Sequence, residues 1–309
     1  MLKGLMKMGT DGLHADRHRR KRKKGARLSL RGRNALEGYL FLAPWLAGLL
    51  LFTLFPVVYS MYLSLSDVQM APAGIKTRFV GIQWYQEAFT LDTTFPLSLL
   101  DTMKFVLLST PMIVVAALLL ALLLNGKFKG RSLFRGICFL PVIIISGPVI
   151  QELLSTRAAA VIRPENYVVY DFMVSLPAVL SGPLLYIFDN VVLILWFSGV
   201  QVVLFLAGLQ KIGQPVREAA AIDGASGWQM FWKIELPFLK SLILLNAIYT
   251  LVQLGAFSNN AVNREVVNKM TLVGKTYGYS AALAWIYFAC MLLVTGVTFL
   301  LLRDKGGKR

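Results

Sequence analysis

The sequence predicts an all-α membrane protein with six transmembrane helices. Of its 309 residues, 56% are hydrophobic and 16% are charged, whereas about a quarter of the residues in an average soluble domain are charged. Several apolar runs reach the length of about 20 residues that crosses a membrane as a helix. Runs such as "MIVVAALLLALLL" (112–124) lack the alternation of a membrane strand, and a backbone in lipid must satisfy its own amides. Each run is therefore expected to be a helix.

The six spans follow the apolar runs along the chain. They are predicted at about 39–65, 98–124, 136–154, 184–209, 241–260 and 279–302. The segment 166–186 is apolar enough to pass as a seventh span, but it contains Asp171, Pro177 and Pro183. An acid and two helix-breaking residues favour an external or interfacial helix in this segment.

The distribution of Lys and Arg supports six spans and indicates their direction. With the N-terminus inside, the cytoplasmic segments hold 12, 4, 4 and 4 of the 32 Lys and Arg; these segments are 1–38, 125–135, 210–240 and 303–309. Positive residues gather on the cytoplasmic side of membrane proteins, and a division of 24 against 8 agrees with that rule. A seventh span would move the last two segments outside. Both termini are therefore expected in the cytoplasm.

The chain is expected to contain a basic cytoplasmic tail (1–35), a transmembrane domain (36–303) with a cytoplasmic loop at 210–240, and a C-terminal tail (304–309). The tail's run "RHRRKRKKGAR" is compatible with nucleic-acid binding. Because it stands beside the first span, we interpret it as a topology determinant that touches anionic lipid. The first apolar stretch is too long for a signal peptide and is not followed by a clear cleavage site. The two cysteines, Cys138 and Cys290, lie in apolar runs and are expected to be small buried hydrophobes.

The loop between the fourth and fifth spans contains "VREAAAIDGASGWQMFWKIELPFLK" (216–240), a polar and alanine-rich segment. Pro215 suits a first helical turn, and "REAAAI" is a strong helix former. Gly224 permits a bend before "GWQMFWKI" resumes an amphipathic pattern, and Pro237 is expected to close that second helix. Such a helix–turn–helix, with Glu218 and Asp223 exposed, is compatible with a docking surface and equally with an ordinary connector.

This segment resembles the EAA signature of permease subunits in binding-protein-dependent ABC importers, of the carbohydrate or maltose-importer type. The matching residues are Glu218, Ala219, Ala220, Gly224, Ile234, Leu236 and Pro237. "YLFLAPWLAGLLLFTLFPVVYSMYLSLSD" (39–67) and "FVGIQWYQEAF" (79–89) resemble the opening helix and an external segment of the same family. The resemblance covers most of residues 36–303.

The resemblance implies the fold of a type I ABC importer permease in the bacterial cytoplasmic membrane. In that family the EAA loop forms the coupling helices, which insert into a cleft of a separate ATPase. Glu218 would pair with a basic residue of the ATPase, Ala219 and Ala220 would allow close approach, and Gly224 would form the turn. The implied partners are a second permease subunit, two ATPase subunits that bind ATP and Mg, and an extracytoplasmic solute-binding protein. The chain itself is expected to bind no cofactor or metal and to catalyse no reaction.

Polar residues within the spans are candidates for the path of the solute, because they are costly against lipid. Asn246, Tyr249, Gln253 and Phe257 recur at helical spacing in the fifth span, and Gln201 in the fourth is a further candidate. Amides can bond sugar hydroxyls while rings stack on C–H faces. Interhelical hydrogen bonds that only hold the bundle together would give the same pattern.

The expected solute is a carbohydrate, in particular an oligosaccharide, with a polyol or glycerol phosphate as the alternative. Trp285 and Tyr287 are interpreted as anchors at the membrane interface. "LVGKT" (272–276) is not a phosphate-binding loop, because the motif requires glycine where Lys269 stands. A secondary transporter would show repeated halves, and an intramembrane enzyme would need catalytic residues in the spans, whereas both histidines lie in the basic tail.

Overall fold

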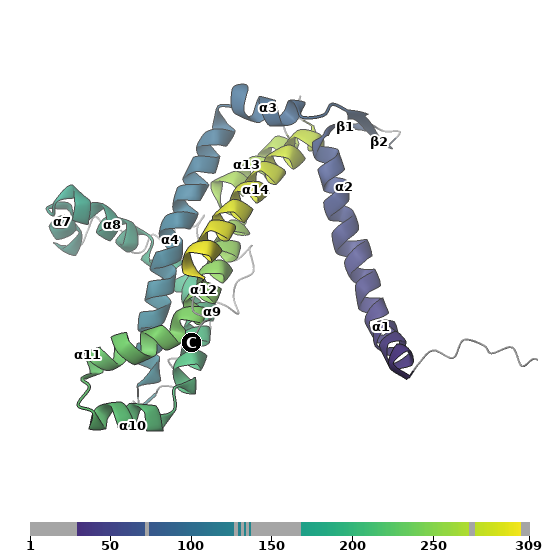
Figure 1. Cartoon of the computed structure of the whole chain (residues 1–309). Coiled ribbons are helices and arrows are strands. Elements are labelled where there is room, and N and C mark those ends of the chain that lie inside the picture. The colour runs from purple at the N-terminus through teal and green to yellow at the C-terminus, as the bar shows by residue number, and fades with distance from the viewer. Residues whose placement is uncertain are drawn as a thin grey trace, which may run out of the picture. The chain divides into compact units, whose positions relative to one another are not determined.

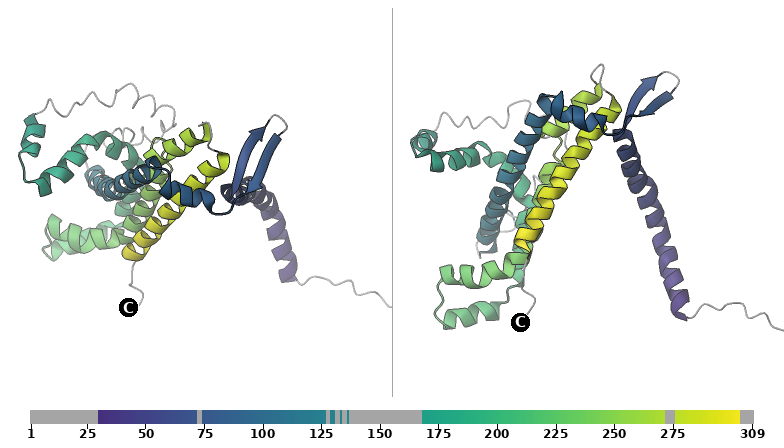
Figure 2. Two further views of the ribbon diagram at one scale, coloured as in Figure 1. Left: turned by 90° about the horizontal axis from the view of Figure 1, so that it is seen from above. Right: turned by 45° about the horizontal axis from the view of Figure 1, so that its top comes forward.

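The computed structural model of the chain is a set of long helices with one small β-hairpin (Figures 1 and 2). It describes residues 30–71, 74–126, 168–271 and 276–303, together with residues 129, 130, 133 and 136. The chain divides into two units, residues 1–58 and 59–309, and each is described by itself. The predicted third span (136–154) apart from residue 136, residues 1–29 of the basic tail, and "LVGK" (272–275) lie outside the described residues.

The first unit contains α1 (Leu30–Leu49), a π-helical turn η1 (Leu50–Leu54) and the beginning of α2 (Phe55–Ser64). The stretch Glu37–Ser64 is long and apolar enough to cross a membrane. In the π turn the Phe55 N–H bonds the Leu50 carbonyl, immediately before Pro56. Proline has no N–H and its ring crowds the preceding turn, so the wider π turn lets the helix continue past it.

A β-hairpin follows α2 in the second unit and is the exception to the predicted all-α fold. Strands β1 (Ser66–Ala71) and β2 (Gly74–Phe79) pair antiparallel, with Ser66 opposite Phe79. On β1, Val68 is buried whereas Gln69 is exposed, which is the period of two expected of a half-buried strand.

The body of the second unit is built from α4 (Thr94–Asn125), α9 (Val191–Lys211), α12 (Leu236–Gly255) and α14 (Tyr277–Leu302). α12 packs against each of the other three. Two shorter amphipathic helices lie at one end of this bundle, α3 (Gln83–Thr90) beside the hairpin and α13 (Ala261–Thr271) against α4 and α14.

The buried core of the bundle has three successive clusters. One joins α3, α4, α13 and α14 near the hairpin, around Phe95 and Leu283. The second lies between α4, α9 and α12, around Ile113 and Leu254. The third fills the other end of the same three helices, around Phe205 and Leu239. Because small residues such as Ala117 and Ala121 have no exposed surface there, the helices approach closely, as is usual in membrane bundles.

The segment 166–186, which is ambiguous in sequence, contains two short helices, α7 (Val168–Val174) and α8 (Ala178–Asp189), separated at Pro177. At 7 and 12 residues, neither reaches the roughly 20 residues of a span. Asn190 separates α8 from α9, and its side-chain amide donates to the Tyr186 carbonyl over 2.9 Å. The fourth membrane helix therefore begins after Asn190, and the predicted start at residue 184 is too early.

Within the described part of the chain, five helical stretches are long and apolar enough to cross a membrane. They are Glu37–Ser64, Thr94–Asn125, Leu193–Lys211, Gly227–Gly255 and Tyr277–Leu302. The stretch near the fifth predicted span (241–260) starts 14 residues earlier and ends five residues earlier than predicted.

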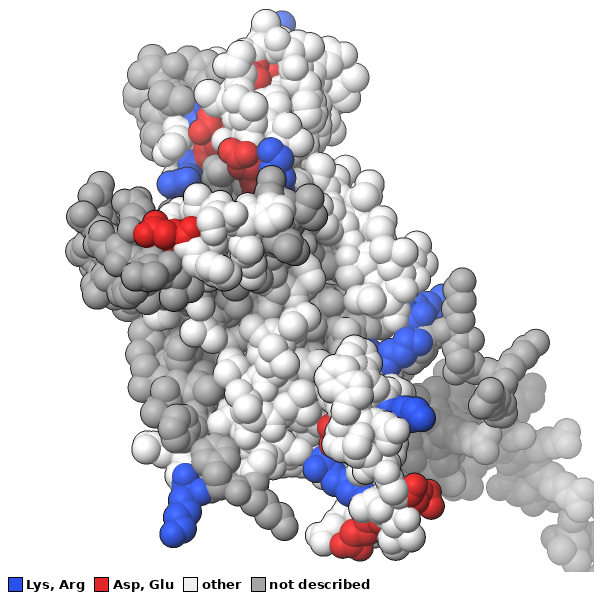
Figure 3. Space-filling view, turned by 90° about the vertical axis from the view of Figure 1, so that its left-hand side faces the viewer, with Lys and Arg blue, Asp and Glu red and all other residues white. Residues whose placement is uncertain are grey.

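A charged cluster at the hairpin end of the bundle joins α4, α13 and α14. Asp92 accepts hydrogen bonds from the Thr94 and Phe95 N–H groups at the start of α4, over 3.0 and 3.1 Å, and from the Tyr279 hydroxyl over 2.6 Å. Lys269 on α13 lies 3.0 Å from Asp92 and 3.2 Å from Glu265. Acidic and basic side chains lie together at this end in Figure 3. The buried carboxylate of Asp92 therefore connects three helices, α4, α13 and α14.

The hydrogen bonds to Asp92 determine its charge. Burial alone would raise the pKa of Asp92, but donors from Tyr279, Thr94, Lys269 and Phe95 outweigh it, so the pKa lies well below its ordinary value of 3.8. Because the pKa is lower in the folded state, the stabilisation is present above pH about 4 and is lost as the pH falls through the folded value.

Lys269 shows the opposite direction. Burial alone would lower its pKa, but Asp92 and Glu265 outweigh that effect and raise the pKa above 10.5. Its contribution is therefore fully present below pH 10.5 and is lost as the pH rises through the raised folded value.

We expect Asp92→Asn to lower the free energy of unfolding by about 2 kcal/mol, the order of one hydrogen bond to a charged group. Asparagine keeps the shape of the side chain and can still accept from the N–H groups at the start of α4. Because it is uncharged, it cannot form the ion pair with Lys269. Thermal unfolding of the detergent-solubilised protein at pH 7 measures the loss. Asp101→Asn, at an exposed acid of α4, is the control and should change it by less than about 0.5 kcal/mol. Equal effects of the two variants would show that the cluster contributes nothing.

Candidate functional site

The segment that resembles a coupling loop lies at the end of the bundle opposite the hairpin and α3 (Figure 1 and Figure 2, right). It consists of α10 (Gln214–Ile222), the short α11 (Gly227–Met230) and a π turn η4 (Phe231–Glu235) that leads into α12. Because the long helices separate the two ends, the segment and the hairpin lie on opposite sides of a membrane that the bundle crosses.

The turn between α10 and α11 has the geometry that requires glycine. Gly224 has φ +77°, in the left-handed region that residues with a Cβ rarely adopt. The Gly224 N–H bonds the Ala221 carbonyl over 3.1 Å, and the Ala225 N–H bonds the Ala220 carbonyl over 2.9 Å. This pair of bonds is a Schellman motif, which satisfies carbonyls that the helix end leaves without partners.

The helix after the turn has its own start signal. The Ser226 hydroxyl accepts from the Gln229 N–H over 3.3 Å, and the Gln229 side chain accepts from the Ser226 N–H over 3.0 Å. This capping box satisfies two donors of the first turn reciprocally. The letters "DGASGWQ" therefore specify both the end of one helix and the beginning of the next.

One face of α10 is exposed although it carries apolar side chains. Val216, Ala219 and Ile222 follow each other at three-residue spacing and are all exposed, Ile222 to 87%. The neighbouring acids Glu218 and Asp223 are also exposed, and acidic side chains appear at this end of the molecule in Figure 3. Glu218 accepts a hydrogen bond from Gln214 over 2.7 Å. An apolar strip flanked by acids fits a surface that contacts another protein.

Three of the other predicted coupling residues lie toward the bundle, whereas Pro237 is exposed. Ala220 is buried, and Ile234 and Leu236 are half-buried. The prediction that Pro237 closes the second helix is wrong, because α11, η4 and α12 form one continuous helical stretch from Gly227 to Gly255. As at Pro56, the π turn before the proline accommodates the missing N–H.

The structure groups three of the predicted path residues with one that the sequence did not single out. Gln201 on α9 donates from one amide to the Thr250 hydroxyl over 2.8 Å and to the Gln253 carbonyl oxygen over 3.1 Å. Asn246 lies one turn before Thr250, whose hydroxyl bonds the Asn246 carbonyl over 2.7 Å. Thr250 could have been found as a small polar residue four positions after Asn246.

This cluster retains unused hydrogen-bonding capacity. Gln201 and Asn246 have no exposed surface, and among the described residues nothing bonds the Gln201 Oε1 or either polar atom of the Asn246 side chain. A buried polar atom without a partner costs about 1–3 kcal/mol. Some buried polar atoms of the cluster therefore take no part in the hydrogen bonds that hold the helices together.

Two of the candidates do not join the cluster. Tyr249 is 39% exposed, and no described hydrogen bond links it to the amides. Phe257 lies beyond the end of α12 at Gly255, and its ring packs edge-on against Phe197 with centroids 5.2 Å apart. The predicted single helical face therefore ends one turn earlier than the sequence spacing suggested.

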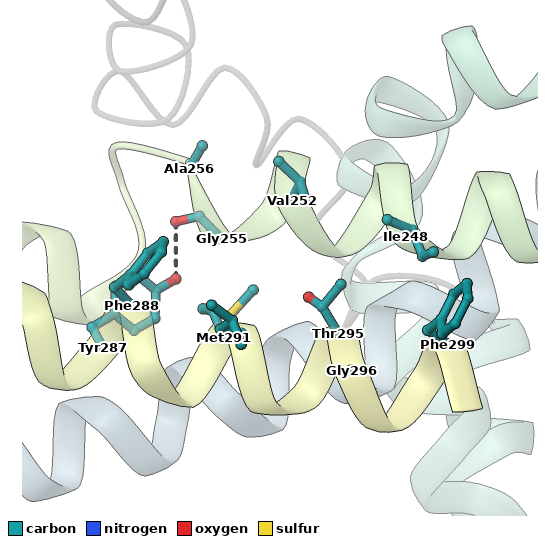
Figure 4. Close-up of a pocket in the computed structure, with 11 residues that line it drawn as sticks. Ile248, Val252, Gly255, Ala256, Tyr287, Phe288, Met291, Thr295, Gly296 and Phe299 are labelled. Carbon is teal, nitrogen blue, oxygen red and sulfur yellow. Dashed lines mark hydrogen bonds between the residues drawn. The ribbon is translucent and has the colours of Figure 1, made fainter. Parts of the chain in front are cut away.

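Tyr287 is not an interfacial anchor, because it is buried and its hydroxyl donates to the Gly255 carbonyl over 2.9 Å. It lines a cavity of about 640 Å³ between α12 and α14 (Figure 4). The other lining side chains are mainly apolar, such as Val252, Met291 and Phe299. A sugar would find few hydrogen-bond partners there, so this cavity is not our candidate for its path.

Comparison with known proteins gives a consistent result, although no family model matches. The chain is 31% identical to the trehalose/maltose transport system permease protein MalF of Thermococcus litoralis, over 71% of this chain and 73% of that protein. It is 31% identical to the arabinooligosaccharides transport system permease protein AraP of Halalkalibacterium halodurans, over 71% and 67%. It is 28% identical to the probable ABC transporter permease protein YesP of Bacillus subtilis, over 85% and 89%.

A solved structure has the same fold. It is a chain of a bacterial alginate ABC transporter, in complex with a periplasmic protein that carries an alginate pentasaccharide. The TM-score is 0.65 at 19% identity, over 88% of this chain and 95% of that chain.

Proposed function

Because the chain belongs to the permease subunits of binding-protein-dependent ABC importers for carbohydrates, we propose that it carries an oligosaccharide inward by alternating access. It is a multi-pass protein of the bacterial cytoplasmic membrane. The observation that carries the proposal is the exposed face of α10, at the end of the bundle opposite the hairpin.

The choice of an oligosaccharide rests on two kinds of support. Similar proteins are named for trehalose and maltose and for arabinooligosaccharides. The cluster of Gln201, Asn246 and Gln253 offers buried amide atoms that a sugar hydroxyl can bond. Amides both donate and accept, as hydroxyl groups also do.

The proposed assembly contains a second permease subunit, two cytoplasmic ATPase subunits that bind ATP and Mg, and an extracytoplasmic binding protein. In this assembly the exposed strip of α10, with Val216, Ala219 and Ile222, enters a cleft of one ATPase. Glu218 pairs there with a basic residue. Closure of the ATPase dimer moves α10, and the continuous helix from Gly227 to Gly255 carries that movement to the amide cluster. Coupling requires such a rigid element with two positions.

The function is tested by reconstituting the four kinds of subunit in liposomes and measuring ATP hydrolysis with a panel of solutes. The proposal expects stimulation by an oligosaccharide together with its binding protein, and no uptake when the ATPase is omitted. If only a polyol or glycerol phosphate stimulates hydrolysis, that solute is the substrate and the proposed oligosaccharide is wrong. Uptake without the ATPase would contradict the importer class for this subunit.

We expect Asn246→Leu and Gln253→Leu to reduce uptake at least about tenfold at equal expression, because each removes an amide that binds the sugar in the proposed path and hydrogen-bonding sites discriminate strongly. The free energy of unfolding should stay the same or rise in Asn246→Leu. Replacing a buried amide that has no partner by an apolar side chain of similar size is neutral or stabilising.

Uptake assays and thermal unfolding of both variants separate the two roles of the cluster. Tyr249→Phe is the control, because this ring is outside the cluster, and it should leave uptake within about twofold. Unchanged uptake in both leucine variants would remove these amides from the path.

A further inference from the structure

Within the described part of the chain, an ion pair of Arg217 links the coupling helix α10 to the rest of the bundle. Its guanidinium Nη2 lies 3.1 Å from Glu235 Oε1, and the Arg and Glu side chains are 36% and 10% exposed. Within the EAA-like segment these residues stand 18 positions apart and belong to α10 and η4. Neither is among the residues that the sequence analysis assigned to coupling.

The same guanidinium reaches a third element. Arg217 Nη2 also donates to the Leu209 carbonyl over 3.4 Å, in the last turn of α9. The same carbonyl accepts from the Ile212 N–H over 3.3 Å, and a cation is favourable near the carbonyls of a helix C-terminus. One side chain therefore contacts the end of α9 and the π turn η4, which leads into α12.

α10 has few other attachments to the bundle. Ala220 is its one residue buried in the described structure, and its C-terminal connection runs through the turn at Gly224, with φ +77°. Two helices joined by a single turn can change their angle by small rotations at that turn. A contact between Arg217 and Glu235, away from the turn, fixes this angle because it adds a second point of attachment.

We propose that the Arg217–Glu235 ion pair is the positioning element that passes movement of α10 to α12. This inference rests on the proposed function of the loop and adds residues to it. With the pair intact, α10 and the helix of Gly227–Gly255 move as one body. Without it, an ATPase can still hold α10 through Glu218 and the apolar strip. However, α10 then pivots at Gly224 and the membrane helices do not move with it.

The test uses the assembled transporter in liposomes and measures uptake and ATP hydrolysis in the same sample. Glu235→Arg and Arg217→Glu should each lower the ratio of solute transported to ATP hydrolysed by about tenfold or more, in the usual range of coupling between two sites. The double variant with both substitutions should restore the ratio to within about threefold, because it recreates the pair with reversed polarity. Lys233→Glu, a charge reversal at an exposed neighbour in η4, should leave the ratio unchanged.

Co-purification of the ATPase distinguishes this inference from the docking proposal. The single variants should retain the ATPase, since Glu218 and the apolar strip are intact. Wild-type ratios in both single variants, or a double variant as uncoupled as the single ones, would overturn the inference. Loss of the ATPase from the single variants would also overturn it, because the pair would then shape the docking surface. Should Glu235→Arg fail to fold, Glu235→Gln keeps the size of the side chain and should still lower the ratio. Full uptake by Glu218→Arg would instead contradict the docking proposal alone.

Discussion

Reversing the charge of Glu218 is expected to abolish solute uptake while the protein still inserts into the membrane. Glu218 is exposed on α10 and beside the apolar strip of Val216, Ala219 and Ile222, so the substitution disturbs no packing within the chain. In the proposed complex the carboxylate faces a basic residue. Breaking one partner of a buried interfacial ion pair costs about 2–5 kcal/mol, and an arginine adds repulsion. Glu218→Arg should therefore weaken ATPase binding and lower uptake about a hundredfold.

The measurement is uptake per inserted protein, with co-purification of the ATPase from the same membranes. Gln214→Ala is the matched control, because it removes the 2.7 Å hydrogen bond to Glu218 without changing the charge. It should leave uptake within about threefold. Wild-type uptake in Glu218→Arg would show that this face of α10 does not dock.

Gly224→Val is expected to have the second largest effect. At φ +77° a residue with a Cβ is strained by about 1–2 kcal/mol, and by more when it is β-branched. No atom lies within 4 Å of the added Cβ, so the strain comes from the backbone alone. The turn should relax toward another conformation and change the angle of α10, which lowers uptake by about tenfold or more.

Gly227→Val provides a close comparison. Its Cβ would also meet no atom within 4 Å, but Gly227 begins α11 and does not need a positive φ. Uptake should stay within about twofold of wild type. Gly224→Asp is informative as well, because Asp and Asn tolerate the left-handed region, so a loss there would arise mainly from charge. Equal activity of the two valine variants would contradict the role of the turn.

The turn itself could be predicted from local sequence because its determinants are local. "REAAAI" before Gly224 and the Ser226–Gln229 pair after it specify a helix end and a helix start within a few residues. The apolar runs likewise place membrane helices, since length and composition alone satisfy the requirement of lipid.

Features that depend on compensation between neighbours were missed. Pro237 was expected to end a helix, yet the π turn Phe231–Glu235 absorbs its effect, as η1 does before Pro56. The hairpin at 66–79 was missed because its strands are short and mainly polar. Only the alternation around Val68 and the Pro and Gly of "APAG" in the sequence favour strands here.

Contacts between distant residues could not be derived from spacing. The sequence marks Gln201 and Gln253 as polar residues within apolar runs, but which faces of α9 and α12 meet depends on packing of the whole bundle. The same is true of the pair Arg217–Glu235 and of Asp92 with Lys269. Phe257 was misplaced because the helical period was extended past Gly255, where α12 ends.

If α10 couples ATP hydrolysis to transport, it lies on the cytoplasmic side of the membrane and against the ATPase. Cys138 and Cys290 are replaced by serine, and single cysteines are introduced by Ile222→Cys on α10 and Arg78→Cys on the hairpin, at the two opposite ends of the bundle. We expect the cysteine at 222 to resist an impermeant thiol reagent applied from outside and to crosslink to the ATPase. The cysteine at 78 should be labelled from outside and should form no crosslink to the ATPase. Labelling of position 222 from outside, or no crosslink to the ATPase in any nucleotide state, would contradict the account.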